Sequence, residues 1–69
     1  MPRPFSEGAP VVVHYLGTTE QGVVERIEDG GRSLLVVTEH DEVLQFHLTA
    51  SMYFITADHS ARLLHAYDR

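Results

Sequence analysis

Cysteine is absent from this sequence of 69 residues, and no lysine occurs among its basic residues. Without cysteine, the disulfides that stabilise many very small secreted domains cannot form, so we expect a reducing, cytoplasmic setting. The sequence also has no apolar run of about 18 residues, and its opening Met-Pro-Arg-Pro-Phe-Ser-Glu-Gly lacks the apolar stretch of a signal peptide. We therefore expect a soluble protein that is neither exported nor embedded in a membrane.

Positive charge is scarce as well. Five arginines face ten acidic residues, which gives a formal net charge of -5. Proteins that bind the phosphate backbone usually carry a basic patch, so this balance disfavours a nucleic-acid partner. That alternative stays open only if arginines gather on one face, and its candidate contacts are Arg26, Arg32 and Arg62.

The residue patterns that carry catalysis or metal binding are missing too. No serine stands in a Gly-x-Ser-x-Gly context, and no His-Glu-x-x-His or His-x-His spacing occurs. The pairs His40-Asp41 and Asp58-His59 are neighbours in sequence, and neighbours on a strand point to opposite faces. We therefore predict no catalytic residue, no metal-ligand set and no bound cofactor.

The segments that are present favour β-strands. Residues 1–10 hold all three prolines and are expected to form a flexible arm that is ordered only near Phe5 and Gly8, followed by a single domain over 11–69. Four runs rich in β-branched and aromatic residues predict strands at 11–16, 22–27, 34–38 and 43–48, with a loop over 17–21. Residues 61–67 fit either a closing strand or a two-turn helix that begins near Asp58. We favour the strand, because a fifth strand closes the sheet and removes its edges.

These short strands predict an all-β fold, a five-stranded, strongly bent antiparallel barrel. Val24 and Ile27 are three residues apart, so one bulge between them is needed to bring both to the same face. Residues 28–31, Glu-Asp-Gly-Gly, supply glycines for the positive φ angles of a hairpin turn.

The first half of the chain resembles a known family. The run Gly-Ala-Pro-Val-Val-Val at 8–13, the loop up to Gly22, and Gly-Val-Val-Glu-Arg-Ile-Glu-Asp-Gly-Gly at 22–31 are similar to the opening of SH3-like small barrels of the Tudor and KOW kind. The resemblance implies a fold rather than a function, with inward-pointing side chains at Val11, Val13, Val24 and Ile27.

The sequence departs from that family at its binding positions. KOW modules that bind RNA carry basic residues around the first loop, whereas this chain has Thr18, Thr19, Glu20 and Gln21 there. Filling of the core accounts for the aromatic residues from which a Tudor cage would be built, namely Tyr15, Phe46, Tyr53 and Phe54.

The hairpin over 34–46 is unusual because its first strand is apolar on both faces. A turn centred on His40 and Asp41, with a loop of two or four residues, pairs Thr38 with Val43 and so fixes the two faces. The core face then holds Leu35, Val37, Leu44, Phe46 and Leu48. The outer face holds Leu34, Val36, Thr38, Val43, Gln45 and His47, next to Val12, His14 and Leu16 of the first strand.

A contiguous apolar group on a small domain indicates a covered surface. We predict self-association, most simply as a dimer, through Val12, His14, Leu34, Val36, Val43 and His47. The face has two other possible covers: Phe5, the arm or the C-terminal segment of the same chain, and a different protein.

The predicted function is a non-catalytic, self-associating barrel that acts as an interaction or accessory module. One alternative is a KOW-like nucleic-acid binder. Another is an oligomeric small-molecule binder or enzyme whose site lies at a subunit junction, where His14, Tyr15, Gln45 and His47 would converge.

Overall fold

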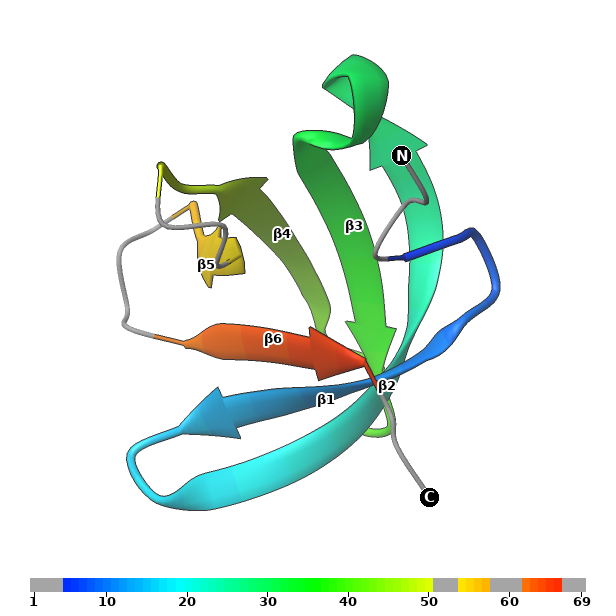
Figure 1. Cartoon of the computed structure of the whole chain (residues 1–69). Helices are drawn as coiled ribbons and strands as arrows, with labels where there is room; N and C mark the ends of the chain where they lie inside the picture. Colours follow the sequence, from blue (N-terminus) through cyan, green and yellow to red (C-terminus); the bar gives the residue numbers. More distant parts are fainter. Residues whose placement is uncertain (1–4, 51–53, 58–61, 67–69) are drawn as a thin grey trace.

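The computed structural model describes residues 5–50, 54–57 and 62–66, and Figure 1 shows their strands wrapped into a barrel. The order around the closed antiparallel barrel is β1 to β6, with β6 paired to β1. Its strands are β1 (Pro10–Tyr15), β2 (Thr18–Glu28), β3 (Ser33–Thr38), β4 (Val43–Leu48), β5 (Phe54–Thr56) and β6 (Leu63–Ala66). The predicted all-β class and barrel closure are confirmed, and at this coarse level the fold is compatible with an SH3-like barrel.

The barrel has six strands rather than the five predicted. The added strand is β5, whose three residues pair with β4 on one side and β6 on the other. The closing segment is β6, a strand as favoured, and Phe54 lies opposite Leu64 in the β5–β6 pairing. Tyr53 and Asp58, which figured in the sequence predictions, lie outside the described residues. Among the described residues, no helix is long and apolar enough to cross a membrane.

Residues 5–10 of the predicted arm, where we expected order only near Phe5 and Gly8, lie against the barrel. Phe5 is buried in the core, and its ring contacts that of Phe54 edge-on with centroids 5.3 Å apart. The backbone N–H of Gly8 donates to the carbonyl of Val24 at 2.8 Å, and the N–H of Val24 donates to the carbonyl of Ala9 at 3.0 Å. Pro10 lacks a backbone N–H only at its own position, and Gly8 and Ala9 before it extend the pairing with β2.

The hairpin between β1 and β2 is tighter than predicted. Tyr15 pairs with Thr18 across a two-residue turn in which Leu16 and Gly17 both have positive φ, 50° and 80°. Two positive φ angles give the type I′ turn, whose twist matches that of the strands. The segment predicted as a loop therefore belongs to β2 from Thr18 onward, and a leucine in the first turn position concealed this.

The predicted bulge in β2 is confirmed. The β2–β3 register shifts between Val24 and Arg26, which leaves Glu25 as the extra residue. Val24 is thereby buried and Ile27 packs against the same core. The turn after β2 has the positive φ angles that were predicted for its glycines. It is a short 3-10 turn, η1 (Asp29–Gly31), and all three of its residues have positive φ.

The predicted β3–β4 register is wrong by one residue. The N–H of Thr38 donates to the carbonyl of Glu42 at 2.8 Å, so three residues form the loop and Val37, not Thr38, lies opposite Val43. Asp41 adopts φ of 62°, which completes a type I turn with a left-handed residue. The hydroxyl of Thr38 accepts the N–H groups of His40 and Glu42, both at 3.2 Å, and so stabilises this loop.

This shift exchanges the two faces of β3, because side chains alternate along a strand. Leu34 and Val36 lie in the core with 2% and 0% of their surface exposed, and Thr38 is buried beside them. Leu35 and Val37, predicted to be core, are half-buried on the outside. The prediction for β4 was correct at Leu44 and Phe46, which are buried. The barrel interior is filled by side chains, the most completely buried being Phe46, Leu34, Val11, Val24, Val36 and Thr56.

Candidate interaction surface

The corrected register gathers a different apolar group on the outside of the barrel. Pro10 lies opposite Val23, Val23 opposite Val37, and Val37 opposite Val43, so four strands contribute one side chain each. Neighbouring strands are about 4.8 Å apart, so these side chains are in contact range across about 14 Å of surface. We call these four residues the outer row.

The outer row is substantially open to solvent. Val43 is 59% exposed and Val23 is 46% exposed, although both are large apolar residues. Leu35 lies two positions before Val37 on the same strand and extends the apolar surface toward the η1 end. Single exposed valines are ordinary, whereas neighbours in register form a continuous patch.

A shallow groove of about 420 Å³ crosses the outer row. Its apolar wall is formed by Pro10, Val23 and Val37, and polar groups close it along β2 and at the end of β3. These lining residues are Gln21, Gly22, Glu25, Thr38 and Glu39. A smaller depression of about 190 Å³ lies on the other side of Val43, against Gln45 and Ala57. Three residues of the outer row therefore line the groove, and the fourth, Val43, lines the smaller depression.

Gly22 shapes the groove floor and the packing below it. A Cβ atom at this position would lie 3.0 Å from both Cγ1 of Val36 and the carbonyl oxygen of Val37. Real Cβ atoms essentially never approach more closely than this. The close approach of β2 to β3 at the groove therefore depends on a residue without a side chain.

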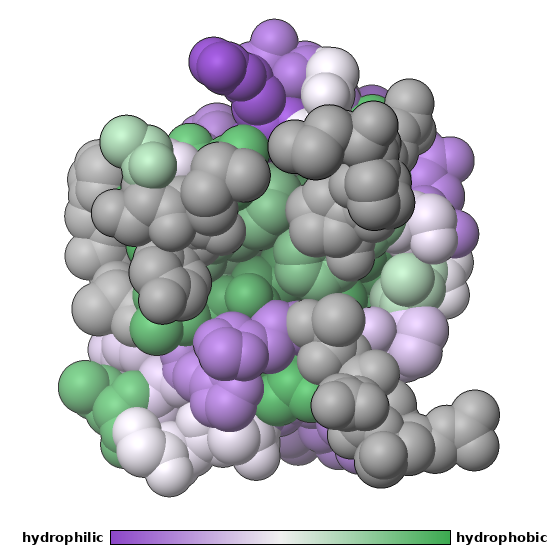
Figure 2. Space-filling view, in the orientation of Figure 1, coloured by the Kyte–Doolittle hydropathy of each residue, from purple (hydrophilic) through white to green (hydrophobic). Residues whose placement is uncertain are grey.

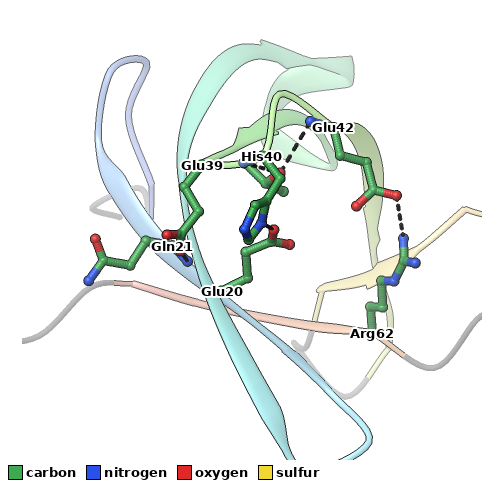
Figure 3. A network of polar contacts seen from close by, with 7 residues as sticks. Glu20, Gln21, Glu39, His40, Glu42 and Arg62 are labelled. Carbon is green, nitrogen blue, oxygen red and sulfur yellow. Dashed lines mark hydrogen bonds and ion pairs between the residues drawn. The ribbon is translucent and has the colours of Figure 1, made fainter.

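Polar side chains form a network beside the groove, at the end of the barrel where β3 passes into β4 (Figure 3). The N–H of Gln21 donates to the carboxylate of Glu39 at 2.7 Å, and the N–H of Glu39 returns to the carbonyl of Gln21 at 2.8 Å. This reciprocal pair ties the β3–β4 turn to β2. It uses one oxygen of the Glu39 carboxylate.

The same end carries two ion pairs. The imidazole Nδ1 of His40 contacts the carboxylate of Glu20. The guanidinium of Arg62 lies 3.6 Å from the carboxylate of Glu42. The hydrogen bond to Glu20, its charge, and the charges of Glu39 and Glu42 raise the pKa of His40 above its ordinary value of about 6.5. The His40 side chain is 74% exposed, so salt weakens this effect on its pKa.

The residues predicted to form the self-association face do not share one surface. Leu34 and Val36 are in the core. Val12 and His14 are half-buried on β1, while Val43 and His47 are exposed on β4. Only Val43 of the predicted set belongs to the outer row. His47 lies farther along β4, where its Nδ1 is 2.9 Å from the hydroxyl of Ser33.

The β1–β6 side of the barrel has a separate character. The rings of His14 and His65 lie 4.6 Å apart between centroids, a contact that arises because β6 closes the barrel against β1. Figure 2 shows this side, with hydrophilic residues below the apolar centre of the view and apolar surface again at the lower left, where the β1–β2 hairpin turns. Leu16 stands at that turn, 80% exposed and away from the outer row.

The candidate nucleic-acid contacts are spread along the barrel. Arg26 lies 3.4 Å from Glu28, and Arg32 follows η1 at the start of β3. Arg62 pairs with Glu42 beyond the other end of β3, with its guanidinium 4.9 Å from the Tyr15 ring centroid. A strand of this length spans about 17 Å, so these arginines do not form one basic patch.

The residues of the alternative small-molecule site are also separated within one chain. His14 and Tyr15 end β1, whereas Gln45 and His47 lie on β4, and two strands come between β1 and β4 in either direction round the barrel. Over the described ranges 5–50, 54–57 and 62–66, no group of three or more potential metal ligands comes together. His59, also considered in sequence, lies outside these ranges.

The outer row was not predicted. Of its four residues, only Val43 was placed on the outer face from the sequence, and it is 59% exposed. The missing step was the odd-numbered loop at 39–41, for which the sequence offered one sign: Asp41, a residue type that tolerates left-handed backbone.

No protein-family model, curated protein or solved structure matches this chain.

Proposed function

We propose that this protein is a non-catalytic interaction module that binds another polypeptide chain through the outer row. The observation that carries the proposal is the direct pairing of four exposed or half-buried apolar residues across β1 to β4. The likeness of residues 8–31 to Tudor and KOW modules belongs to the proposal only as a fold-level expectation, since a fold does not fix a function.

A surface role is supported by how the interior is used. Phe46, Val11 and Val36 have no exposed surface, so the barrel interior is occupied by its own side chains. A ligand of this domain therefore binds on the outside, as expected for a barrel this small.

The size of the row sets the strength of binding. Covering the exposed parts of Val23 and Val43 stabilises a complex by about 2 kcal/mol in total. Stable complexes usually bury about 800 Å² on each partner, far more than four small side chains provide. We therefore propose a weak, reversible interaction that depends on additional polar contacts around the row.

A second copy of the chain is the first partner to test, because self-association was the expectation from sequence. The test is the solution mass by light scattering over a wide concentration range, for the wild type and for Val43→Glu. Leu16→Asn is the matched control, since it also removes an exposed aliphatic residue but lies at the β1–β2 turn.

Self-association predicts a mass that rises with concentration in the wild type and in Leu16→Asn but stays monomeric in Val43→Glu. A monomer throughout rejects a second copy as the partner. The interaction proposal itself is rejected if, in addition, no peptide probe of any charge binds at the outer row.

A further inference from the structure

The groove over the outer row has polar ends of one charge sign. Glu25 and Glu39 both line it, and Val23 and Val37 lie in its middle. Among the described residues no arginine pairs with either carboxylate, because Arg26 is engaged with Glu28 and Arg62 with Glu42. The groove is therefore apolar at its centre and negative at its two ends.

The spacing of these groups follows from the strand. Gln21, Val23 and Glu25 alternate along the outer side of β2, and Glu39 is hydrogen-bonded to Gln21. Successive side chains on one face of a regular strand are about 7 Å apart, so the Glu39 carboxylate, held at the backbone of Gln21, lies about one such repeat from Val23. On the other side of Val23, Glu25 follows two positions later at the bulge, where the regular repeat is interrupted. An extended peptide has the same repeat between its residues i and i+2.

The carboxylates are able to accept a ligand. Glu25 is the extra residue of the bulge and is exposed. Glu39 uses Oε2 to accept the N–H of Gln21, which leaves Oε1 for another donor. Lysine and arginine side chains are the donors that pair with such oxygens. In an extended peptide whose apolar residue contacts the valines, basic side chains two positions away lie on the same face and point toward the groove.

From this geometry we propose that the partner is an extended segment of another protein in which an aliphatic residue has a lysine or arginine two positions before and after it. The inference rests on the proposed function and specifies its partner. A second copy is a poorer occupant of this groove, because each copy has a net charge of -5 and would bring further carboxylates toward Glu25 and Glu39.

The test uses three capped, fluorescently labelled peptides with the same central leucine: Lys-Ser-Leu-Ser-Lys, Gln-Ser-Leu-Ser-Gln and Glu-Ser-Leu-Ser-Glu. Binding to the whole chain is measured by fluorescence anisotropy in low salt. Two exposed ion pairs predict that the lysine peptide binds about tenfold more tightly than the glutamine peptide, and that this advantage is lost near 500 mM salt, where screening extends over only about 4 Å.

Two variants of equal charge change locate the site. Glu25→Lys reverses a groove carboxylate and is expected to weaken binding of the lysine peptide by about fivefold or more. Glu28 lies on the same strand but outside the groove. Glu28→Lys is therefore expected to change the affinity for the lysine peptide by less than about twofold. Val43→Glu, the variant that tests the row, is measured beside them.

The outcomes separate the two proposals. Equal affinity for the three peptides, lost in Val43→Glu, leaves the interaction module standing and overturns a basic partner. Equal effects of Glu25→Lys and Glu28→Lys also overturn it, since attraction would then come from overall charge. If none of the peptides binds, the basic partner is rejected, and together with a monomeric mass this result rejects the interaction module as well.

Discussion

Val36 and Val37 are adjacent valines on opposite faces of β3, and replacing each with alanine tests the barrel's register. Val36 has no exposed surface, and Val37 is half-buried on the outer side. Both substitutions remove the same atoms from the same strand, so strand propensity and effects on the unfolded chain nearly cancel between them. The difference in stability therefore reports burial.

The expected sizes follow from the packing. Val36→Ala removes two methyl groups from the filled interior, which costs about 1.6 kcal/mol of transfer free energy and more for the cavity left behind, about 2 to 3 kcal/mol together. Val37→Ala exposes little that was buried and should cost about 1 kcal/mol or less. For a domain of this size the first change lowers Tm by about 10 to 20 °C.

Urea unfolding of the two variants and the wild type measures these differences, provided that the m-value is unchanged. The register with a three-residue loop requires the larger loss in Val36→Ala. If Val37→Ala is the more damaging substitution, Thr38 pairs with Val43 instead, Val37 is core, and the outer row does not exist as described.

Three further predictions concern single positions. Gly22→Ala should destabilise the fold by about 1 to 3 kcal/mol in urea unfolding, because its Cβ meets Val36 and a backbone carbonyl at 3.0 Å; wild-type stability would contradict the close approach at the groove. Leu16→Asn should raise stability by about 0.5 to 1 kcal/mol, since asparagine tolerates the positive φ of the turn and an 80% exposed leucine loses no packing; a lower Tm would argue against that turn. His40 should titrate above 6.5 by NMR and move toward 6.5 in Glu20→Gln. Because the folded-state pKa of His40 is raised, the contribution of His40 to stability is complete below about pH 6.5 and is lost as the pH rises through that folded-state pKa. A His40 titration that Glu20→Gln leaves unchanged would contradict the ion pair between these two residues.

The parts of the fold that the sequence predicted are those set by local patterns. Four β-branched runs indicated four strands correctly, and the spacing of Val24 and Ile27 required the bulge that β2 contains. The closing strand followed from the need to remove sheet edges, although its alanine and leucine residues favour a helix locally.

The parts that failed depend on single backbone conformations or on contacts distant in sequence. Whether the loop after Thr38 holds an even or odd number of residues is decided at Asp41, and that one residue exchanged both faces of β3. Phe5 packs on Phe54, almost fifty positions away, so no local pattern identified the residue that Phe5 contacts. The outer row was missed because Val37 lies opposite Val43 only when the loop between β3 and β4 has three residues.

The binding role of the outer row is tested most directly by amide chemical shifts of the labelled protein during titration with the lysine-flanked leucine peptide. We expect the largest shifts at Val23, Val37 and Val43, with a smaller change at Glu39, and shifts close to zero along β6. Shifts centred on the β1–β6 side near His14 and His65 would contradict the assignment of this surface, as would no shifts at any peptide concentration together with a monomeric solution mass.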